Sequence, residues 1–295
     1  MKYVIVGASG FVGSNLMRHL RGLGCAVVGT QSLSRAAGLV TFDLERDRIL
    51  DCVPKSFFEG PEKVSLVVAA VISDMDRCLT ERERSYRINV THTIRLLQDV
   101  AAIGAKPIYI SSNFVFDGTL GYYNETDLVA PANEYGRHKA EVEAYLSGNI
   151  PQAFVARFDK IVSGDPTEKH LLANWYKELV AGRPIVALRG SLLAPTYVGD
   201  AAKALVLAAE RDFCGIYHVA NAEYFYREEL AFQFCRALGK KAEIISRPAE
   251  EFNFPDTRAL KSNLDGSRFA GLAAMRFTSM REVFALFRQR IQSLG

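Results

Sequence analysis

A doubly wound α/β fold is predicted by two features of the sequence. Short runs of β-branched residues alternate with helix-length amphipathic stretches through the first half of the chain, which is the pattern of βαβ units on a parallel sheet. The first of these runs also leads directly into a glycine-rich turn that opens a helix, an arrangement typical of the first unit of such a sheet. With 295 residues, of which 49% are hydrophobic, the chain is long enough for one large α/β body or two unequal parts.

Each predicted element follows from its local pattern. The strands of the first half are short and apolar, and they cover residues 3–6, 26–29, 39–42, 66–70, 107–111 and 153–157. The helices between them cover 11–23, 82–103 and 134–146, the last two with apolar residues at three- and four-residue spacing. The alternation loosens afterwards, with helices predicted at 170–181, 199–210, 227–238 and 280–294 and a strand at 185–188.

Charge and composition exclude several classes of protein. The formal net charge is only +3, so charge gives no reason to expect a nucleic-acid or membrane partner. The longest apolar runs, such as residues 64–72, are far shorter than the ~20 residues that a membrane span needs. We therefore expect neither partner.

The five cysteines are Cys25, Cys52, Cys78, Cys214 and Cys235. They are odd in number, widely spaced and without a C-x-x-C pair, which fits a reducing compartment better than a disulfide or zinc framework. We expect them to fill the core, no metal site, and a cytoplasmic protein without a secretory signal.

The glycine turn follows the first strand and has the spacing G-x-x-G-x-x-G, with glycines at Gly7, Gly10 and Gly13. Such a turn lets the backbone approach a pyrophosphate at a helix N-terminus. The spacing therefore indicates a dinucleotide site that includes Ser9, Phe11 and Val12, although a purely structural turn is the alternative.

Specificity for the cofactor is expected at the end of the second strand. An NAD enzyme usually carries an acid about 20 residues beyond the glycines, but this chain has Ser32, Ser34 and Arg35 instead. Hydroxyls and a guanidinium favour a 2′-phosphate, so we predict NADPH; alternatively, Arg35 is a solvated loop residue. Asp43 and Leu44 are expected beside the adenine, unless Asp43 caps a helix.

Two serines, Ser111 and Ser112, end a predicted strand, and Tyr135 and Lys139 follow on a helix. Residues at i and i+4 share one helical face, so the ammonium is expected to stabilise the phenolate and lower the pKa of Tyr135. In ketone reduction, Tyr135 would donate a proton to the developing alkoxide while Ser112 bonds the same oxygen. Hydride would come from a nicotinamide.

With these motifs, the sequence resembles the extended short-chain dehydrogenase/reductases. The stretch from Ile110 to Glu125, ISSNFVFDGTLGYYNE, together with Pro131, Tyr135 and residues 194–200 is most similar to dTDP-4-dehydrorhamnose reductases. The resemblance implies a Rossmann cofactor domain, a smaller α/β C-terminal substrate domain, and reduction of the 4-keto group of a nucleotide-linked 6-deoxysugar in deoxysugar and polysaccharide biosynthesis.

The resemblance also implies site residues and domain limits. It carries over Ser112, Tyr135 and Lys139 as the catalytic trio, with serine where the family usually has threonine. It adds Ala69, Ala70 and Asn89 on the cofactor side, Asn89 being alternatively a helix-interior residue without a role. We expect residues 1–157 and about 196–219 to bind NAD(P), and residues 158–195 and 220–295 to bind the sugar nucleotide.

The chain departs from the family at three places. Asn113 stands where the family has an acid, so Asn113-Phe114 does not fit dehydratase chemistry. Arg258 and Lys261 lie in a segment that has lost a proline and an asparagine, and residues 157–160 depart after the arginine. Candidate substrate residues are thus Asn113, Phe114, Arg258 and Lys261, with a solvated basic turn as the alternative for the last two.

Two further candidates are aromatic residues of the predicted helix at 170–181. His170 is placed where it would touch substrate, but a capping or surface role is the stronger interpretation. Trp175 is the only tryptophan, and core packing is favoured over stacking on a sugar or base.

Three hypotheses for function remain open at the level of the sequence. The first is the NADPH-dependent 4-ketoreductase. The second is a non-catalytic dinucleotide-binding subunit resembling the beta subunit of methionine adenosyltransferase, and the third is an epimerase-reductase of the GDP-fucose synthase kind. Homodimerisation through the helices at 82–103 and 134–146 is common in the superfamily and is an expectation here.

Overall fold

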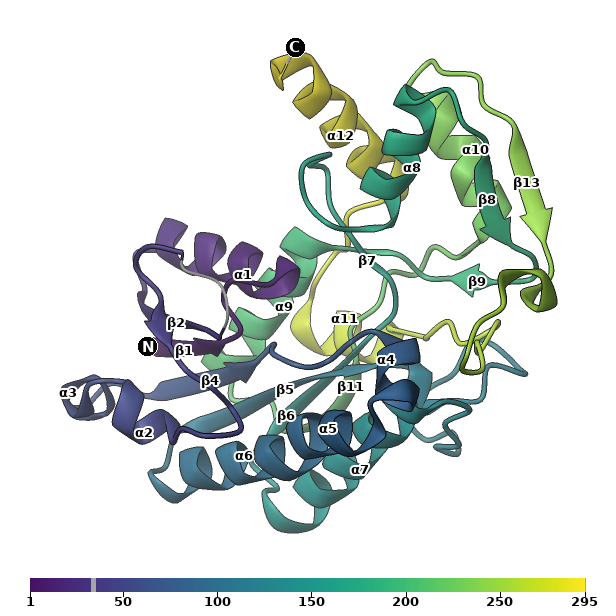
Figure 1. Cartoon of the computed structure of the whole chain (residues 1–295). Helices are drawn as coiled ribbons and strands as arrows, with labels where there is room; N and C mark the ends of the chain where they lie inside the picture. The colour runs from purple at the N-terminus through teal and green to yellow at the C-terminus, as the bar shows by residue number, and fades with distance from the viewer. Residues whose placement is uncertain (33–35, 295) are drawn as a thin grey trace.

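A computed structural model describes residues 1–32 and 36–294, and its centre is a seven-stranded parallel sheet (Figure 1). The strand order is β11-β6-β5-β4-β1-β2-β3, so the chain moves outward from β1 in both directions. The strands are β1 (Lys2–Val6), β2 (Ala26–Gln31), β3 (Val40–Thr41), β4 (Val64–Val68), β5 (Lys106–Ser112), β6 (Phe154–Phe158) and β11 (Gly215–His218). The carboxyl ends of all seven strands therefore meet at one edge of the sheet.

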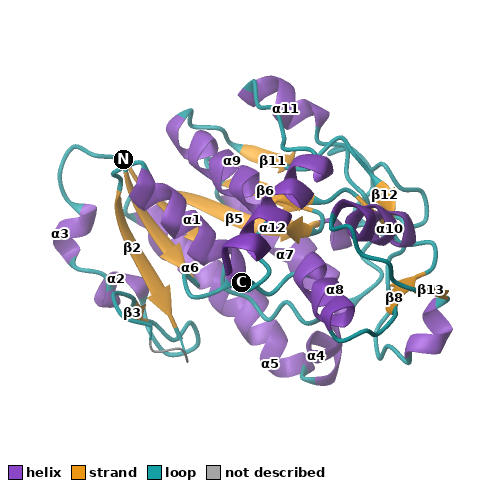
Figure 2. Ribbon diagram, turned by 90° about the horizontal axis from the view of Figure 1, so that it is seen from above, coloured by secondary structure: helices purple, strands orange, loops and turns teal. Residues whose placement is uncertain are grey.

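Helices cover both faces of this sheet, which explains why β4 and β6 are buried along their whole length. On one face α1 (Phe11–Gly22), α9 (Val198–Glu210) and α11 (Ser267–Ala273) share a core with the sheet. On the other face lie α2 (Ile49–Cys52), α6 (Thr93–Ala102) and α7 (Glu134–Asn149), below the sheet in Figure 1, whereas Figure 2 looks down on the face that carries α1 and α9. The doubly wound α/β fold predicted from the sequence is confirmed.

The segment predicted as one helix at 82–103 is continuous but not uniform. It begins as α5 (Arg82–Tyr86), passes through a π-helical turn, η1 (Arg87–His92), and continues as α6. Single π-helical turns within α-helices are frequently found at functional sites. Asn89, one of the predicted cofactor-side residues, lies within this turn.

A second group of elements lies beyond the carboxyl edge of the sheet, in the upper part of Figure 1. It contains α8 (Leu171–Val180), β8 (Ile185–Leu188), α10 (Arg227–Ala237), β13 (Ile244–Arg247) and α12 (Met280–Leu294). Its own core is rich in aromatic side chains, among them Trp175, Phe234 and Phe287. The residue limits proposed for the two domains remain a prediction.

Short elements connect the two groups. They are α4 (Met75–Thr80), η2 (Asn113–Val115), β7 (Ile161–Val162), β9 (Leu192–Leu193), β10 (Thr196–Tyr197), β12 (Phe225–Tyr226) and η3 (Ala249–Phe252). One more short helix, α3 (Lys55–Phe58), lies between α2 and β4, away from the second group. The pairs β10–β7, β12–β9 and β13–β8 form two-stranded sheets of their own. In the described part of the chain, no helix has both the length and the apolar character that a bilayer crossing requires.

The cysteines follow the predicted pattern only in part. Cys78 and Cys235 are buried and Cys25 and Cys52 are half-buried, but Cys214 is exposed. The prediction that all five fill the core is wrong for Cys214, because it follows the turn after α9, on the rim of the sheet, where its sulfur faces Lys106 at 3.5 Å. All five thiols are free.

Candidate active site

The glycine turn after β1 has a backbone that only glycine can supply. Gly7 has a positive φ of 88°, and a Cβ there would lie 2.8 Å from Ala70. A Cβ on Gly13 would collide with the carbonyl oxygen of Gly7. The backbone thus packs closely where α1 begins, leaving the first N–H groups of the helix at the carboxyl edge of the sheet, as a dinucleotide pyrophosphate requires.

A first cavity of about 530 Å³ opens beside this turn. The predicted cofactor residues that line it are Gly7, Ser9, Gly10, Ser32, Asp43, Leu44, Ala69 and Ala70. Asp43 also caps the following turn, because its carboxylate accepts the backbone N–H of Glu45 at 2.9 Å. Ser34 and Arg35 lie outside the described residues.

Sequence reasoning missed other residues of the first cavity. Thr30, Arg77 and Arg84 line it as well. Thr30 is close in sequence to the expected specificity residues, but the two arginines come from α4 and α5, after β4, where no motif pointed to them.

A second cavity of about 380 Å³ continues from the first, since Gly10, Ala69 and Val71 line both. The predicted residues in its wall are Gly10, Phe11, Val12, Ala69, Ser111, Ser112, Tyr135 and Lys139. Gly13 and Asn89 line neither cavity.

A third cavity of about 560 Å³ lies between the sheet edge and the second group of elements. It shares Ser73, Ser112, Tyr135, Asp159, Ile161 and Lys169 with the second cavity. Four candidate substrate residues line it, namely Asn113, Phe114, His170 and Arg258. The three cavities therefore form one continuous channel, and Ser112 and Tyr135 stand where its second and third parts meet.

The catalytic candidates reach this junction from two elements. Ser112 is the last residue of β5, and Tyr135 and Lys139 lie one turn apart on α7. The Nζ atom of Lys139 donates a hydrogen bond to the carbonyl oxygen of Ile110 at 2.6 Å and lies 5.6 Å from the centre of the Tyr135 ring. The structure brings all three side chains together.

The pKa of Tyr135 differs from the sequence expectation. Burial raises the pKa of Tyr135 above its usual value, and only a hydrogen bond with Ser112 opposes the shift. Burial also lowers the pKa of Lys139 to about 7, opposed by Glu143. The expected lowering of the Tyr135 pKa by Lys139 is therefore wrong for this structure. The Nζ atom of Lys139 donates its hydrogen bond to a carbonyl oxygen, and burial lowers the pKa of Lys139, so a smaller fraction of the lysine is charged at neutral pH. The phenol is protonated at neutral pH.

Two contacts fix the start of α7, one within the helix and one with the residues that follow β5. Asn133 caps the helix by accepting the backbone N–H of Gly136 at 2.8 Å. Gly136 itself packs on the backbone of Phe114 so closely that a Cβ would collide with the carbonyl oxygen of Phe114. Because Tyr135 lies between these two residues in sequence, their packing sets its distance from Ser112.

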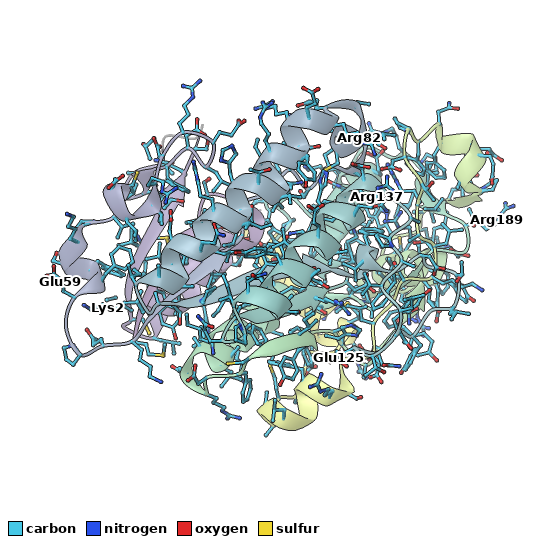
Figure 3. All side chains as sticks on the ribbon, turned by 90° about the horizontal axis from the view of Figure 1, so that it is seen from below. Lys2, Glu59, Arg82, Glu125, Arg137 and Arg189 are labelled. Carbon is cyan, nitrogen blue, oxygen red and sulfur yellow. The ribbon has the colours of Figure 1, made fainter. Side chains whose placement is uncertain are left out.

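Glu134 is a further anchor of the same turn. It is buried and accepts hydrogen bonds from Arg82 of α5 at 3.0 Å and from Arg137 of α7 at 2.8 Å. Figure 3 shows the two arginines close together on these neighbouring helices. The pair joins the helix that carries Tyr135 to the helix before the π-helical turn.

Asn89 shapes the cavities indirectly, through hydrogen bonds to the backbone of a loop that lines them. Its amide accepts the N–H of Ile72 at 2.8 Å and donates to the carbonyl oxygen of Ile72 at 2.9 Å. The loop from Ala69 to Ser73, which contains Ile72, lines all three cavities. Asn89 thus holds the shape of this loop without lining a cavity itself.

Asp159 was not singled out as a site residue by the sequence, although it follows β6 at the same sheet edge. Its carboxylate accepts hydrogen bonds from the Asn113 amide at 3.1 Å, from the N–H of Ala194 at 2.7 Å and from its neighbour's N–H at 2.7 Å. Burial raises the pKa of Asp159 to about 6, and the two backbone hydrogen bonds oppose the shift. The position of the residue at a strand end was the available signal.

The remaining candidates lie in different surroundings. His170 is buried, stacks on Phe11 at 5.4 Å and shares a hydrogen bond with the carbonyl oxygen of Asp165. Trp175 is buried in the aromatic core of the second group and does not line the third cavity. Lys261 is exposed and is likewise absent from the cavity wall.

No three His, Cys, Asp or Glu side chains of residues 1–32 and 36–294 gather as a metal site would require. The polar groups of the described residues that line the three cavities include hydroxyls, amides, a phenol, several cations and the carboxylates of Asp43, Glu45 and Asp159.

Comparison with other sequences gives consistent relatives. A family model described as RmlD substrate binding domain matches residues 1–292. A probable low-salt glycan biosynthesis reductase of Haloferax volcanii is 28% identical over 279 residues, which are 90% of each protein. A dTDP-4-dehydrorhamnose reductase of Mycobacterium tuberculosis is 29% identical over 223 residues, 72% of each. Methionine adenosyltransferase 2 subunit beta of Xenopus tropicalis is 27% identical over 77% of this chain and 69% of its own length.

Comparison with solved structures gives the same fold. A hypothetical dTDP-4-dehydrorhamnose reductase from Sulfolobus tokodaii has a TM-score of 0.83 and is 26% identical, covering 96% of this chain and 99% of its own. A dTDP-4-dehydrorhamnose reductase from Bacillus anthracis, solved in complex with NADP, shares the fold with a TM-score of 0.82 at 20% identity, covering 97% of this chain and 99% of its own.

Proposed function

Because the chain belongs to the RmlD substrate binding domain family, we propose that it is an oxidoreductase that uses NADPH to reduce the 4-keto group of a nucleotide-linked 6-deoxysugar. One observation carries the proposal: Ser112 and Tyr135 line both the second and the third cavity. A proton donor at that junction faces a cofactor on one side and a substrate on the other.

The first and second cavities fit a nicotinamide dinucleotide. The backbone at Gly7 and Gly13 leaves no room for a Cβ, which is the arrangement that lets a pyrophosphate approach the start of α1. Thr30 and Ser32 would face the adenosine half, and Ser111 and Lys139 the nicotinamide half. When bound, the cofactor supplies the hydride that no side chain can provide.

The proton is the contribution of the chain itself. Tyr135 is protonated at neutral pH, as a phenol is at its ordinary pKa and the more so because burial raises that pKa, and it donates its hydroxyl proton to the oxygen that becomes an alkoxide. Ser112, also at the junction, donates a hydrogen bond to the same oxygen and so stabilises the developing charge. Lys139 lies in the wall of the second cavity one turn after Tyr135, where its Nζ atom is held by the carbonyl oxygen of Ile110 at 2.6 Å.

The preference for NADPH rests on the end of β2. The last residues there are Thr30, Gln31 and Ser32, so no carboxylate stands where a 2′-phosphate would lie. Arg77 and Arg84 also line this cavity, but both are paired with Glu81, and Asp43 and Glu45 line it too. The preference therefore depends on the residues that end β2. A phosphate is therefore favoured over a bare ribose hydroxyl.

The test is a panel of nucleotide 4-keto sugars assayed by loss of reduced-nicotinamide absorbance, with NADPH and NADH in parallel. We expect Tyr135→Phe to reduce turnover at least about a hundredfold while binding NADPH within a few-fold of the wild type. A Tyr135→Phe variant that retains turnover would end the assignment. Reduction that proceeds only with NADH would end the cofactor preference.

A second candidate function is favoured by one relative, the beta subunit of methionine adenosyltransferase. On that hypothesis the chain binds a dinucleotide and regulates a separate catalytic chain. A stable complex with such a chain, together with no turnover of any keto sugar in the panel, would favour it over the reductase.

A further inference from the structure

The third cavity carries positive charge that the described residues do not neutralise. Lys160, Lys169 and Arg227 line it, and no carboxylate of residues 1–32 or 36–294 lies within ion-pairing distance of any of the three. Arg258 differs, because it forms an ion pair with Asp76 at 2.7 Å. The cavity therefore contains both a neutralised arginine and cations without a counter-ion.

Arg227 is one of these cations, and it is partly buried. It begins α10, where its backbone N–H donates to the carbonyl oxygen of Ser191 at 2.9 Å. The Nε atom of its side chain is buried and has no hydrogen-bond partner in the structure. Buried donors in native proteins are satisfied by protein, by water or by a ligand, so this Nε atom is available to an acceptor that enters the cavity.

Lys160 lies close enough to Arg227 to be affected by its charge. Burial first, and then repulsion from Arg227, lower the pKa of Lys160 to about 8, while Asp159 opposes the shift. Asp159 offsets only one of the two positive charges, and its carboxylate is held in place by hydrogen bonds from Asn113 and from two backbone N–H groups. Lys160 and Arg227, two cations, are thus accompanied by a single carboxylate, that of Asp159, which is fixed in the cavity wall.

We propose that Lys160 and Arg227 form a subsite for an oxyanion of the substrate, a phosphate or a carboxylate, on the far side of Tyr135 from the cofactor. The inference rests on the proposed function, since it describes the substrate cavity of the same reaction. Arginine matches such oxyanions through parallel N–H donors and lysine through a compact charge. A bound anion would satisfy the buried Nε atom and relieve the repulsion between the two cations.

Lys160 lies in the segment after Arg157 at which the chain departs from the family that it resembles. The anion has two sources in a sugar nucleotide, the diphosphate and an acid group on the sugar, and both have the oxygen chemistry that Lys160 and Arg227 require.

Calorimetric titration of the NADPH-loaded protein with inorganic pyrophosphate and, separately, with D-glucuronate tests the subsite. We expect at least one probe to bind saturably to the wild type. Its affinity should fall at least tenfold in Lys160→Met and in Arg227→Gln. Lys160→Arg, which keeps the positive charge, should bind the probe nearly as well as the wild type. The matched controls are Lys240→Met and Arg236→Gln, exposed residues at the end of α10 and just after it, which should bind as the wild type does. Circular dichroism and thermal unfolding establish that each variant is folded.

The outcomes separate the sources and the hypotheses. Tighter binding of pyrophosphate identifies the diphosphate, and tighter binding of glucuronate identifies an acid on the sugar. The subsite is refuted if neither probe saturates, or if folded Lys160→Met and Arg227→Gln bind as tightly as the controls. Since the titration needs no turnover, a reductase assignment that fails in the keto-sugar assay leaves this result intact.

Discussion

The side-chain amide of Asn113 donates a hydrogen bond to the carboxylate of Asp159 at 3.1 Å, in the wall of the third cavity. The same amide donates to Ser262 at 2.8 Å, so it joins the end of β5 to the residue after β6 and to the C-terminal segment. An amide suits this position because a carboxylate faces it.

Asn113→Asp is expected to destabilise the protein. It places a second buried carboxylate against Asp159, and we expect a loss of about 1–3 kcal/mol of unfolding free energy at pH 8 by urea denaturation. The loss should shrink at pH 5, because Asp159, with a pKa of about 6, is then largely protonated. The exchanged pair Asn113→Asp/Asp159→Asn should recover part of the stability, and equal stability of wild type and single variant at pH 8 would contradict this account.

Gly136→Ala is expected to separate α7 from β5. Its Cβ would collide with the carbonyl oxygen of Phe114, and such overpacking costs about 1–3 kcal/mol. Because the collision lies next to Tyr135, turnover should fall as well. The measurements are urea denaturation and the NADPH-coupled assay.

The control for this substitution is on the same helix. Gly148 has no neighbour within 4 Å of an added Cβ, so Gly148→Ala should raise the unfolding free energy by about 0.5–1 kcal/mol through helix propensity. If both variants changed stability in the same direction, close packing at Gly136 would not be the cause.

Lys139→Met should change how stability depends on pH. The pKa of Lys139 is about 7 in the folded protein and 10.5 when unperturbed, burial being the main cause. Between those values the unfolded chain binds a proton that the folded chain lacks, so the unfolding free energy rises with pH by at most about 1.4 kcal/mol per pH unit. Substitution removes this contribution.

The check is the difference in unfolding free energy between wild type and Lys139→Met at pH 7, 8 and 9. We expect this difference to move in favour of the wild type as pH rises, and the corresponding difference for the exposed Lys240→Met to stay flat. A flat difference for both variants would show that Lys139 keeps its ordinary pKa.

Ser32→Asp is expected to reverse the cofactor preference. A carboxylate at the end of β2 repels a 2′-phosphate and accepts a hydrogen bond from ribose hydroxyls. The KM for NADPH should rise by about tenfold or more, which corresponds to about 1.4 kcal/mol, and the KM for NADH should stay within a few-fold. Parallel steady-state kinetics measure both, and an unchanged ratio of the two KM values would place the phosphate elsewhere.

The doubly wound sheet and its edge were predictable because they depend on local patterns. Parallel strands bring their carboxyl ends to one edge, so the glycine turn after β1 and the serines ending β5 had to meet there. Strand β11 was missed because Gly215–His218 is short and only partly buried. Strand β13 was missed for the same reason, since it pairs only with β8 and has no fully buried residue.

The substrate side was less predictable because it depends on contacts between distant segments. Asp159 meets Asn113 only after β6 pairs with β5, and Arg227 reaches the cavity only when α10 packs against β8. The pKa of Tyr135 was predicted with the wrong sign because a helical spacing shows which residues share a face, but it does not show how deeply the face is buried.

The π-helical turn at Arg87–His92 has a consequence for alignment with relatives. A π turn contains one residue more than an α turn, so the amphipathic pattern of α5 and that of α6 are offset from each other by about 100°. A relative lacking one residue in this segment would have an ordinary helix in which Asn89 and the residues before it face a different direction. Such a single-residue gap would break the hydrogen bonds between the Asn89 amide and the backbone of Ile72, and so would free the loop that lines all three cavities.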